Sequence, residues 1–502
     1  MTTVWDLISS AADRYRDQVL FADERGRTLT GRQFADAAER VAAGLAVSPG
    51  QVVSWQLPSC LEAVVVTAAL ARTGAVQNPI IPILREGDVT LITEDAGTDV
   101  MIVPARWRGF DHGAMADGLK DHCGFEVVTL DLETDPGDRL RLPEGDPAGL
   151  APPPEDDHAC RWVYFSSGTT ARPKGVRHTD ASVIASSNGM IDGLEMGEDD
   201  VYPIAWPIAH IGGIAMINAA LRGGSRLVMF ESFDPSDIGA RMAAVKPTLL
   251  GSAVPFFRAY LDAQRRHGDR PLFPRLRAFV AGGAPTPPEI IRELDETFAT
   301  TGIINSWGLT EFPIATYPTL HDSPEKLATT VGRPVAGVQV KVVDGELRLK
   351  GPQCCSGYTN PALDADAFDE QGWLRTGDLG SVDDEGYVAV TGRLKDVIIR
   401  SAENISALEV EDILLRHPDI ADAAVIGLPD ERTGERVCAV VVTEPGRSVS
   451  LESVAAHFAA QGTARQKIPE QLEVVEAIPR NAMGKIVKTE LRSALLGPAR
   501  PG

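Results

Sequence analysis

Helix-like and strand-like patterns alternate along the first 150 residues, and this alternation restricts the possible folds more than any other property of the chain. Apolar residues recur at helical spacing over residues 4–11, and Thr30 with Gln33 forms a capping box ahead of a second apolar stripe. We expect buried strands over residues 52–57 and 99–103 and an apolar helix over residues 61–71. Alternation at this pitch predicts parallel strands with helices on both faces of the sheet.

The α/β rhythm resumes in the middle of the chain and later gives way to other patterns. We expect a helix over residues 214–221 and strands over residues 225–230, 247–251 and 276–281. Near residue 338 the chain becomes β-rich, and Asp344-Gly345 predicts a hairpin turn. The segment from Asp396 has a helix over residues 406–415, strands over residues 423–426 and 437–442, a helix from Leu451 and a strand before Pro479. The predicted fold class is α/β, with parallel-type sheets covered by helices in a large N-terminal domain, a β-rich subdomain, and a small α+β C-terminal domain.

Length and charge exclude several classes of protein. The chain of 502 residues exceeds what one hydrophobic core normally holds, so at least two domains are expected. Its 44% hydrophobic and 24% charged residues are typical of globular proteins. A net charge of −22 argues against a nucleic-acid partner, because neutralising phosphates takes clustered Lys and Arg. Anionic ligands must therefore be held by a local site.

The cysteines and the N-terminus indicate the compartment. The six cysteines are scattered without a CxxC pair or a metal-like spacing with histidine, which favours a reducing setting. The first residues lack the basic and apolar regions of a signal peptide, and the longest mostly apolar run, residues 63–71, is too short to span a bilayer. We expect a cytoplasmic protein with no transmembrane segment.

A short strand pattern at residues 162–165 runs into the loop sequence SSGTTARPKG. Glycine allows backbone N–H groups to turn toward one point, the hydroxyl side chains add donors, and Lys174 adds a mobile positive charge. The loop therefore suits a polyphosphate, although Lys174 lies between Pro173 and Gly175 and does not complete a Walker A motif. The alternative is a solvated turn between a strand and a helix.

Six further stretches carry chemical groups in a fixed order. They are WPIAH at residues 206–210, NSWGLTE at 305–311, LRTGD at 374–378, GRLKD at 392–396, AENI at 402–405 and NAMGK at 481–485. Together with the hydroxyl-rich loop, they resemble the adenylate-forming superfamily of acyl-CoA synthetases, firefly-type luciferases and peptide-synthetase adenylation domains. The chain is most similar to a bacterial-type acyl-CoA synthetase. The resemblance covers essentially the whole chain and implies a large domain over residues 1–394 and a mobile lid over residues 395–502, with the hinge at Lys395.

The resemblance also implies which residues hold the nucleotide. The hydroxyl-rich loop would bind the β- and γ-phosphates, Asn305 would read the adenine edge, and Trp307 would stack on adenine unless it is only a core aromatic. Asp378 would accept both ribose hydroxyls with help from Arg393, the alternative being a surface turn. The complete implied set is Ser166, Ser167, Gly168, Thr169, Thr170, Lys174, Gly282, Gly283, Ala284, Asn305, Ser306, Trp307, Gly308, Thr310, Asp378, Arg393 and Lys485.

The catalytic residues implied by the same resemblance are Lys485, Glu311, His210 and Arg393. A lysine ammonium stabilises the charge that develops when a carboxylate attacks an anionic α-phosphate, and Lys485 would be carried in and out by the small domain. Thr310 would contact the α-phosphate, and Glu311 would ligate Mg²⁺. The alternative for Lys485 is an exposed lysine, and the alternative for Glu311 is a solvated loop acid. His210 would gate the thiol entrance, the alternative being a core histidine with satisfied hydrogen bonds.

The implied reaction has two halves: a carboxylic acid and MgATP give acyl-AMP and pyrophosphate, and coenzyme A then takes the acyl group. Relatives often carry paired glycines where this chain has Ser401-Ala402. The prediction of thioester formation is therefore less secure than the prediction of adenylation. Residues 211–216 contain no acid that would hold a substrate ammonium, which favours an apolar fatty, alicyclic or aromatic acid. A carrier-protein phosphopantetheine acceptor, a silent nucleotide- or acyl-binding scaffold, and a homodimer all stay open.

Overall fold

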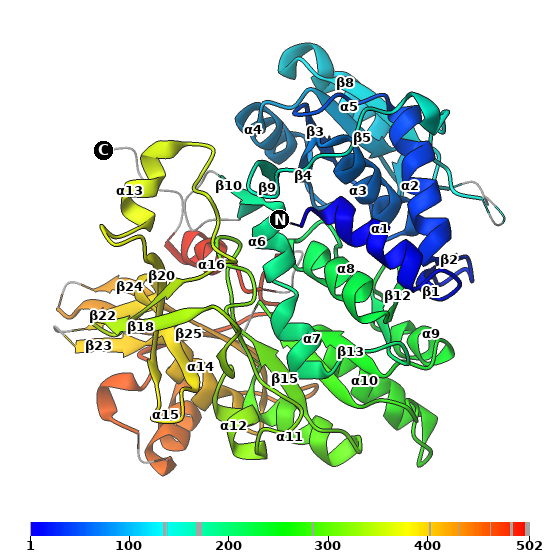
Figure 1. Cartoon of the computed structure of the whole chain (residues 1–502). Coiled ribbons are helices and arrows are strands. Elements are labelled where there is room, and N and C mark those ends of the chain that lie inside the picture. The colour runs from blue at the N-terminus through cyan, green and yellow to red at the C-terminus, as the bar shows by residue number, and fades with distance from the viewer. Residues whose placement is uncertain are drawn as a thin grey trace.

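The computed structural model describes residues 2–133, 137, 139–166, 173–283, 286–400, 403–430, 432–461, 463–481 and 485–496 (Figure 1). The elements β22 to β25 lie with α14 and α15 on one side of the molecule, away from the blue N-terminal helices and their sheet. This mixed α/β arrangement, with largely parallel sheets and a small α+β C-terminal part, confirms the predicted fold class.

A six-stranded sheet forms the centre of the N-terminal part. All neighbouring strands are parallel except β10 and β9. In spatial order its strands are β10 (Lys174–Thr179), β9 (Cys160–Ser166), β4 (Val76–Pro79), β3 (Val52–Trp55), β5 (Val100–Pro104) and β8 (Glu126–Leu130). Helix α3 (Leu61–Thr73) is apolar on nearly every side and almost wholly buried. Apolar side chains around the whole circumference explain this position, because a surface helix keeps one polar face.

Three further sheets complete the large N-terminal part. One contains β11 (Val201–Ile204), β12 (Arg226–Met229), β1 (Val19–Asp23) and β2 (Thr28–Thr30). A parallel one contains β13 (Leu249–Ser252), β14 (Ala278–Gly282) and β15 (Ile303–Ser306). An antiparallel one contains β18 (Gln339–Val343), β19 (Glu346–Lys350), β20 (Leu374–Val382) and β21 (Val388–Arg393). The turn between β18 and β19 is the hairpin predicted at Asp344-Gly345. Short pairs are formed by β6 (Arg106–Trp107) with β7 (Phe110–Asp111) and by β16 (Thr316–Tyr317) with β17 (Arg333–Pro334).

The C-terminal part has its own sheet and core. Its strands are β23 (Glu403–Ser406), β22 (Val397–Arg400), β25 (Gly434–Thr443), β24 (Ile420–Asp430) and β26 (Gln471–Val474). Apolar residues of this sheet pack against α14 (Ala407–Leu415) and α15 (Leu451–Ala460) in a separate cluster that includes Leu414, Val425 and Phe458. A separate core is typical of a domain.

The remaining helices cover the sheets. They are α1 (Val4–Arg14), α2 (Gly31–Leu45), α4 (Glu86–Ala96), α5 (His112–Cys123), α6 (Asp180–Ala185), α7 (Asn188–Leu194), α8 (Ile211–Gly223), α9 (Ile238–Ala244), α10 (Val254–His267), α11 (Pro288–Thr297), α12 (Pro324–Thr329), α13 (Asp364–Ala367) and α16 (Lys488–Leu496). The predicted capping box is present at the start of α2, where Thr30 and Gln33 satisfy each other's backbone N–H groups. In the described ranges, no helix is long and apolar enough to cross a membrane.

The hydroxyl-rich loop joins two antiparallel strands. Lys174 pairs with Ser166 in the register of β10 and β9, so the two described ends of the loop lie opposite each other. The alternative of a solvated turn between a strand and a helix is wrong in one respect, because the element after the loop is the strand β10. Phosphate binding by the loop stays a prediction. Ser167, Gly168, Thr169 and Thr170 lie outside the described residues.

Candidate active site

Two parallel strands end side by side at the centre of the predicted site. Gly282 of β14 pairs with Ser306 of β15, and a Cβ atom at Gly282 would lie 2.8 Å from Ser306 Oγ. A side chain at this position would require the Ser306 hydroxyl to rotate away. Gly283 follows with a φ of +79°, a left-handed conformation that also favours glycine. The two glycines therefore place the half-buried Asn305 and Ser306 beside the exposed Gly283, while Ala284 lies outside the described residues.

Asp378 connects Trp307 with Arg393. The residue is only 2% exposed, and its Oδ2 accepts a hydrogen bond from Trp307 Nε1 at 2.8 Å. Arg393 Nε lies 2.7 Å from Asp378 Oδ1 as an ion pair, but the angle is not that of a hydrogen bond. Hydrogen bonds to a charged group contribute about 1.5–3 kcal/mol, so the indole fixes the carboxylate firmly. Trp307 itself is buried among apolar residues of the β-rich sheet.

Glu311 is held by a tyrosine that lies far along the chain. The Tyr358 hydroxyl donates a hydrogen bond to Glu311 Oε1 at 2.8 Å. The Lys174 Nζ atom lies 6.0 Å from the centroid of the Tyr358 ring, within the range of a cation–π contact. Tyr358 therefore lies between the lysine of the hydroxyl-rich loop and the carboxylate predicted to bind Mg²⁺.

The main chain at Thr310 is held by a buried histidine. His178 Nε2 lies 2.8 Å from the Thr310 carbonyl oxygen, and its Nδ1 lies 2.9 Å from Ser182 Oγ. Because a carbonyl only accepts hydrogen bonds, the proton is on Nε2. Burial lowers the pKa of His178 to about 4, so the ring is neutral at physiological pH. His178 fixes the loop that follows β15 against β10.

Lys485 lies in a cluster of positive charge. Burial, followed by the nearby Arg393 and Lys395, lowers the pKa of Lys485 to about 8. Partial burial and Arg393 likewise lower the pKa of Lys395. Asp378 and Asp396 oppose the shift of both lysines but do not cancel it. Three cations gathered around one ion-paired carboxylate form a site suited to a phosphate anion.

His210 is near enough to Lys485 to feel its charge. Burial of its ring and then the charge of Lys485 lower the pKa of His210 to about 4. His210 is the N-cap of α8, and its Nδ1 accepts a hydrogen bond from the Gly212 N–H at 3.2 Å. A Cβ atom at Gly212 would also lie 3.5 Å from the Trp206 indole. The neutral histidine is thus held in place by its own helix.

The structure brings some of the residues predicted from the sequence together and adds two that were missed. Direct contacts join Asp378 with Trp307 and Arg393. Lys485 is near enough for Arg393 and Asp378 to act on its pKa, and its own charge acts on the pKa of His210. Tyr358 and His178 were not predicted, and they position Glu311 and Thr310 respectively. For Tyr358, the one available signal in the sequence was its position after Gly357, since this Gly-Tyr pair follows a turn. Nothing in the sequence distinguishes His178 from an ordinary strand residue.

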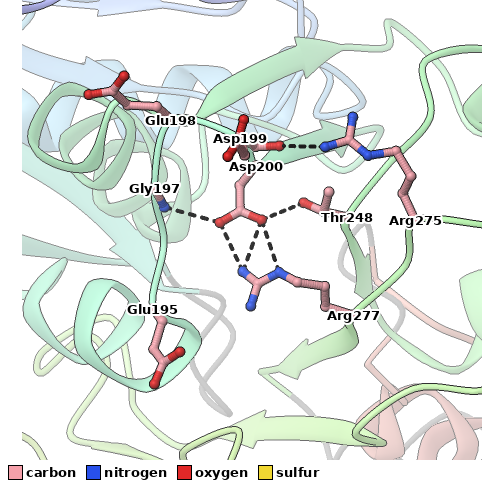
Figure 2. A pocket seen from close by; sticks show the side chains of 8 residues that line it. All are labelled: Glu195, Gly197, Glu198, Asp199, Asp200, Thr248, Arg275 and Arg277. Carbon is pink, nitrogen blue, oxygen red and sulfur yellow. Dashed lines mark hydrogen bonds and ion pairs between the residues drawn. The ribbon is translucent and has the colours of Figure 1, made fainter.

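A surface cavity of about 450 Å³ lies among residues that play no part in this group (Figure 2). At its centre, the Asp200 carboxylate accepts hydrogen bonds from Gly197 N, Thr248 Oγ1 and Arg277. Arg275 donates to the Asp199 carbonyl oxygen. These partners satisfy the hydrogen-bonding groups of Asp200 and pair it with Arg277. The two side chains therefore hold loops together, which is a structural role.

This arrangement of a large α/β part, a small C-terminal part and a charged group between them is that of an adenylate-forming enzyme. The chain belongs to the AMP-binding enzyme family, which matches residues 8–359, and the C-terminal domain of that family matches residues 409–485. The resemblance inferred from the motifs, to the acyl-CoA synthetase type of this superfamily, is thereby confirmed.

Relatives match over nearly the whole chain. The medium-chain fatty-acid–CoA ligase of Escherichia coli (strain K12) is 32% identical over 96% of this chain and 88% of its own. The salicylyl-CoA synthase / salicylate adenylyltransferase of a Streptomyces species is 32% identical over 97% of this chain and 93% of its own. Among solved structures, ATP-bound MatB from Rhodopseudomonas palustris has a TM-score of 0.85 at 26% identity, covering 98% of both chains.

Proposed function

We propose that this protein is a cytoplasmic AMP-forming acyl-CoA ligase that activates an apolar carboxylic acid with MgATP and transfers it to coenzyme A. The observation that carries the proposal is the group formed by Lys485, Arg393, Asp378 and His210. It supports the adenylation half of the reaction, because it combines a ribose acceptor with cations for the α-phosphate.

In the first half-reaction, Lys485 places its ammonium between the attacking carboxylate and the α-phosphate, where like charges would otherwise repel. Asp378, fixed by Trp307, accepts hydrogen bonds from the ribose hydroxyls. Asn305 and the end of β14 hold the adenine edge, while Ser166, Lys174 and the loop between them hold the departing phosphates. The neutral His210 fits a gate beside the acyl group better than a proton carrier.

The residues around Glu311 fit Mg²⁺. Tyr358 occupies only Oε1 of the carboxylate, and oxygen is the ligand that Mg²⁺ prefers. Among the described residues, no group of three or more His, Cys, Asp or Glu side chains could hold a metal ion. One carboxylate together with substrate phosphates is the usual mode of Mg²⁺ binding. When bound, the ion neutralises phosphate charge, and Glu311 is the side chain that would hold it.

In the second half-reaction, the C-terminal part rotates about Lys395 and withdraws Lys485 from the site. The thiol of coenzyme A then attacks the carbonyl carbon of acyl-AMP, the C–S bond forms and AMP leaves. Ser401 and Ala402, which would face the incoming thiol, lie outside the described residues. The boundary at Lys395 belongs to this proposal.

The start of α8 supports an apolar substrate. Residues 211–216 carry no acid, and the Trp206 indole lies against Gly212 beside His210. An α-amino acid would leave its ammonium without a partner there, and an unpaired buried charge is costly. Apolar walls discriminate weakly, because one methylene contributes about 1–3 kcal/mol, so fatty, alicyclic and aromatic acids all belong to the proposed class.

The test is a mass-resolved product assay with MgATP, coenzyme A and a panel of short, medium, long, alicyclic and aromatic acids. We expect AMP, pyrophosphate and one acyl-CoA in equal amounts, and no product from the matched Lys485→Ala variant. If acyl-AMP accumulates without thioester, the acceptor is another thiol. If no acid produces AMP, the proposed function is wrong.

A further inference from the structure

Two adjacent cysteines lie in the segment that supports Glu311. Cys354 is half-buried and Cys355 is 7% exposed. All six cysteines of the chain are free thiols, and Cys354 and Cys355 are the one pair that is adjacent in sequence. Interaction between the two side chains lowers the pKa of the Cys354 thiol and raises that of the Cys355 thiol, which burial raises further. The segment therefore carries a vicinal dithiol, a group that the proposed reaction does not use.

The main chain at this dithiol is tied to two parts of the nucleotide site. The Cys355 N–H donates to the Glu311 carbonyl oxygen at 2.8 Å, and the Ser356 N–H donates to the Arg177 carbonyl oxygen at 2.8 Å. Tyr358, which donates to the Glu311 carboxylate, follows three residues after Cys355. A change of main-chain conformation at the dithiol is therefore transmitted to both the backbone and the side chain of Glu311.

We propose that Cys354 and Cys355 form a redox-sensitive modification site, which a small hydroperoxide such as hydrogen peroxide converts to a vicinal disulfide that impairs adenylation. The disulfide itself is inferred from the adjacency of two free thiols in the chain. Its effect on activity rests on the proposed function of Glu311.

The oxidation balances with one molecule of hydrogen peroxide. The thiolate of the more exposed Cys354 attacks a peroxide oxygen, an S–O bond forms, the O–O bond breaks, and the hydroxide that leaves takes up a proton to become water. The Cys355 sulfur then attacks Sγ of Cys354, the S–S bond forms, and the S–O bond breaks to release a second water. The two sulfurs together lose two electrons and the peroxide gains them.

Geometry explains why the disulfide would disturb Glu311. Adjacent Cα atoms are about 3.8 Å apart across a trans peptide, whereas Cα atoms joined by a disulfide are usually about 4.4–6.8 Å apart. The peptide between Cys354 and Cys355 must therefore distort, and this peptide carries the N–H that donates to Glu311. A strained disulfide is also readily reduced, so the modification is reversible by a dithiol.

The experiment treats the full-length protein with hydrogen peroxide and then with dithiothreitol, and measures the mass of the peptide containing both cysteines. Acid-dependent pyrophosphate release is measured in parallel. The wild type is compared with Cys354→Ser and with Cys123→Ser, which removes another half-buried thiol that has no neighbouring cysteine. Because serine preserves the size of the side chain and the backbone N–H, Cys354→Ser should fold normally.

We expect the wild-type and Cys123→Ser peptides to lose two mass units, together with at least a tenfold loss of pyrophosphate release that dithiothreitol restores. Cys354→Ser should keep its activity within about twofold. The proposal is overturned if peroxide produces no such disulfide, or if the disulfide forms and pyrophosphate release does not change. If no protein releases pyrophosphate even before oxidation, the proposed function fails, while the peptide mass still decides whether the modification occurs.

Discussion

At the level of single residues, the environment of Lys485 decides how the proposed enzyme responds to substitution. Replacing Lys485 with Ala should abolish acid-dependent pyrophosphate release, because the charge between carboxylate and α-phosphate is lost. The reaction of supplied acyl-AMP with coenzyme A should persist, since Lys485 is withdrawn in that half. The two half-reactions are measured separately by pyrophosphate release and by thioester formation. Equal loss of both would contradict the assigned role.

The same variant should not lose stability. The folded-state pKa of Lys485 is lowered from its ordinary value to about 8, so the folded state binds the proton less tightly than the unfolded state. The charge therefore destabilises the folded arrangement below pH 8, and this cost fades as pH rises toward the ordinary pKa. A thermal unfolding scan of Lys485→Ala at pH 7 thus controls for misfolding.

The pKa of Lys485 also predicts a pH dependence. The ammonium is the active form, so kcat/KM for adenylation should fall about tenfold per pH unit above pH 8, because kcat/KM reports the ionisation of the free enzyme. Lys485→Arg should be slower but should lack this alkaline decline, because a guanidinium stays charged. The measurement is pyrophosphate release from pH 6 to 10. If kcat/KM of Lys485→Arg declines above pH 8 as in the wild type, the ionisation belongs to another group.

At the level of elements, Asn481 holds the main chain of Lys485 ahead of α16. Asn481 Oδ1 accepts a hydrogen bond from the Lys485 N–H at 3.0 Å, and the Asn481 N–H donates to the Lys485 carbonyl oxygen at 2.8 Å. Arg480, immediately before, contacts both carboxylate oxygens of Asp422 at 2.8 Å. The lysine is therefore held at its main chain and not only by its flexible stem.

Replacing Asn481 with Ala should lower the kcat of adenylation about three- to tenfold, since one such hydrogen bond contributes about 0.5–1.5 kcal/mol. Thioester formation from supplied acyl-AMP should not change. Asn481→Asp, which keeps the oxygen acceptor, is the matched control and should stay closer to the wild type. A loss of the same size in the thioester step would mean that the substitution acts on the fold of the C-terminal part instead.

At the level of the whole molecule, the proposed reaction requires the C-terminal part to rotate about Lys395. Lys395 lies in a short 3-10 helix over residues 394–396. The typical φ of a 3-10 helix, about −50 to −70°, is near that of proline. Lys395→Pro should therefore keep the arrangement seen in this structure and resist the change of φ that rotation needs. We expect adenylation to persist and thioester formation to fall at least tenfold, with Lys395→Ala as the matched control. Normal acyl-CoA formation by Lys395→Pro would rule out the hinge.

Local signals made much of the fold predictable. The capping box at Thr30 and Gln33, the hairpin at Asp344-Gly345 and the apolar helix over residues 61–71 each depend on residues close in sequence, and all three are present. The element that follows the loop after β9 was harder to predict, because the same Gly, Ser and Thr residues suit a loop before a helix or before a strand. Only pairing of β10 with β9 distinguishes the two.

By itself, the sequence determined the succession of elements and the order of the chemical motifs, because helix and strand periodicity, turn residues and reactive side chains are properties of neighbouring positions. The tertiary structure decided which of these groups meet. Glu311 is held by Tyr358, Thr310 by His178, and Lys485 has its pKa lowered by Arg393 and Lys395. The first two contacts join residues far apart in the chain, and the pKa of Lys485 depends on burial and on charges brought close by packing. No local pattern specifies such distances, which arise only when the sheets and the C-terminal part pack together.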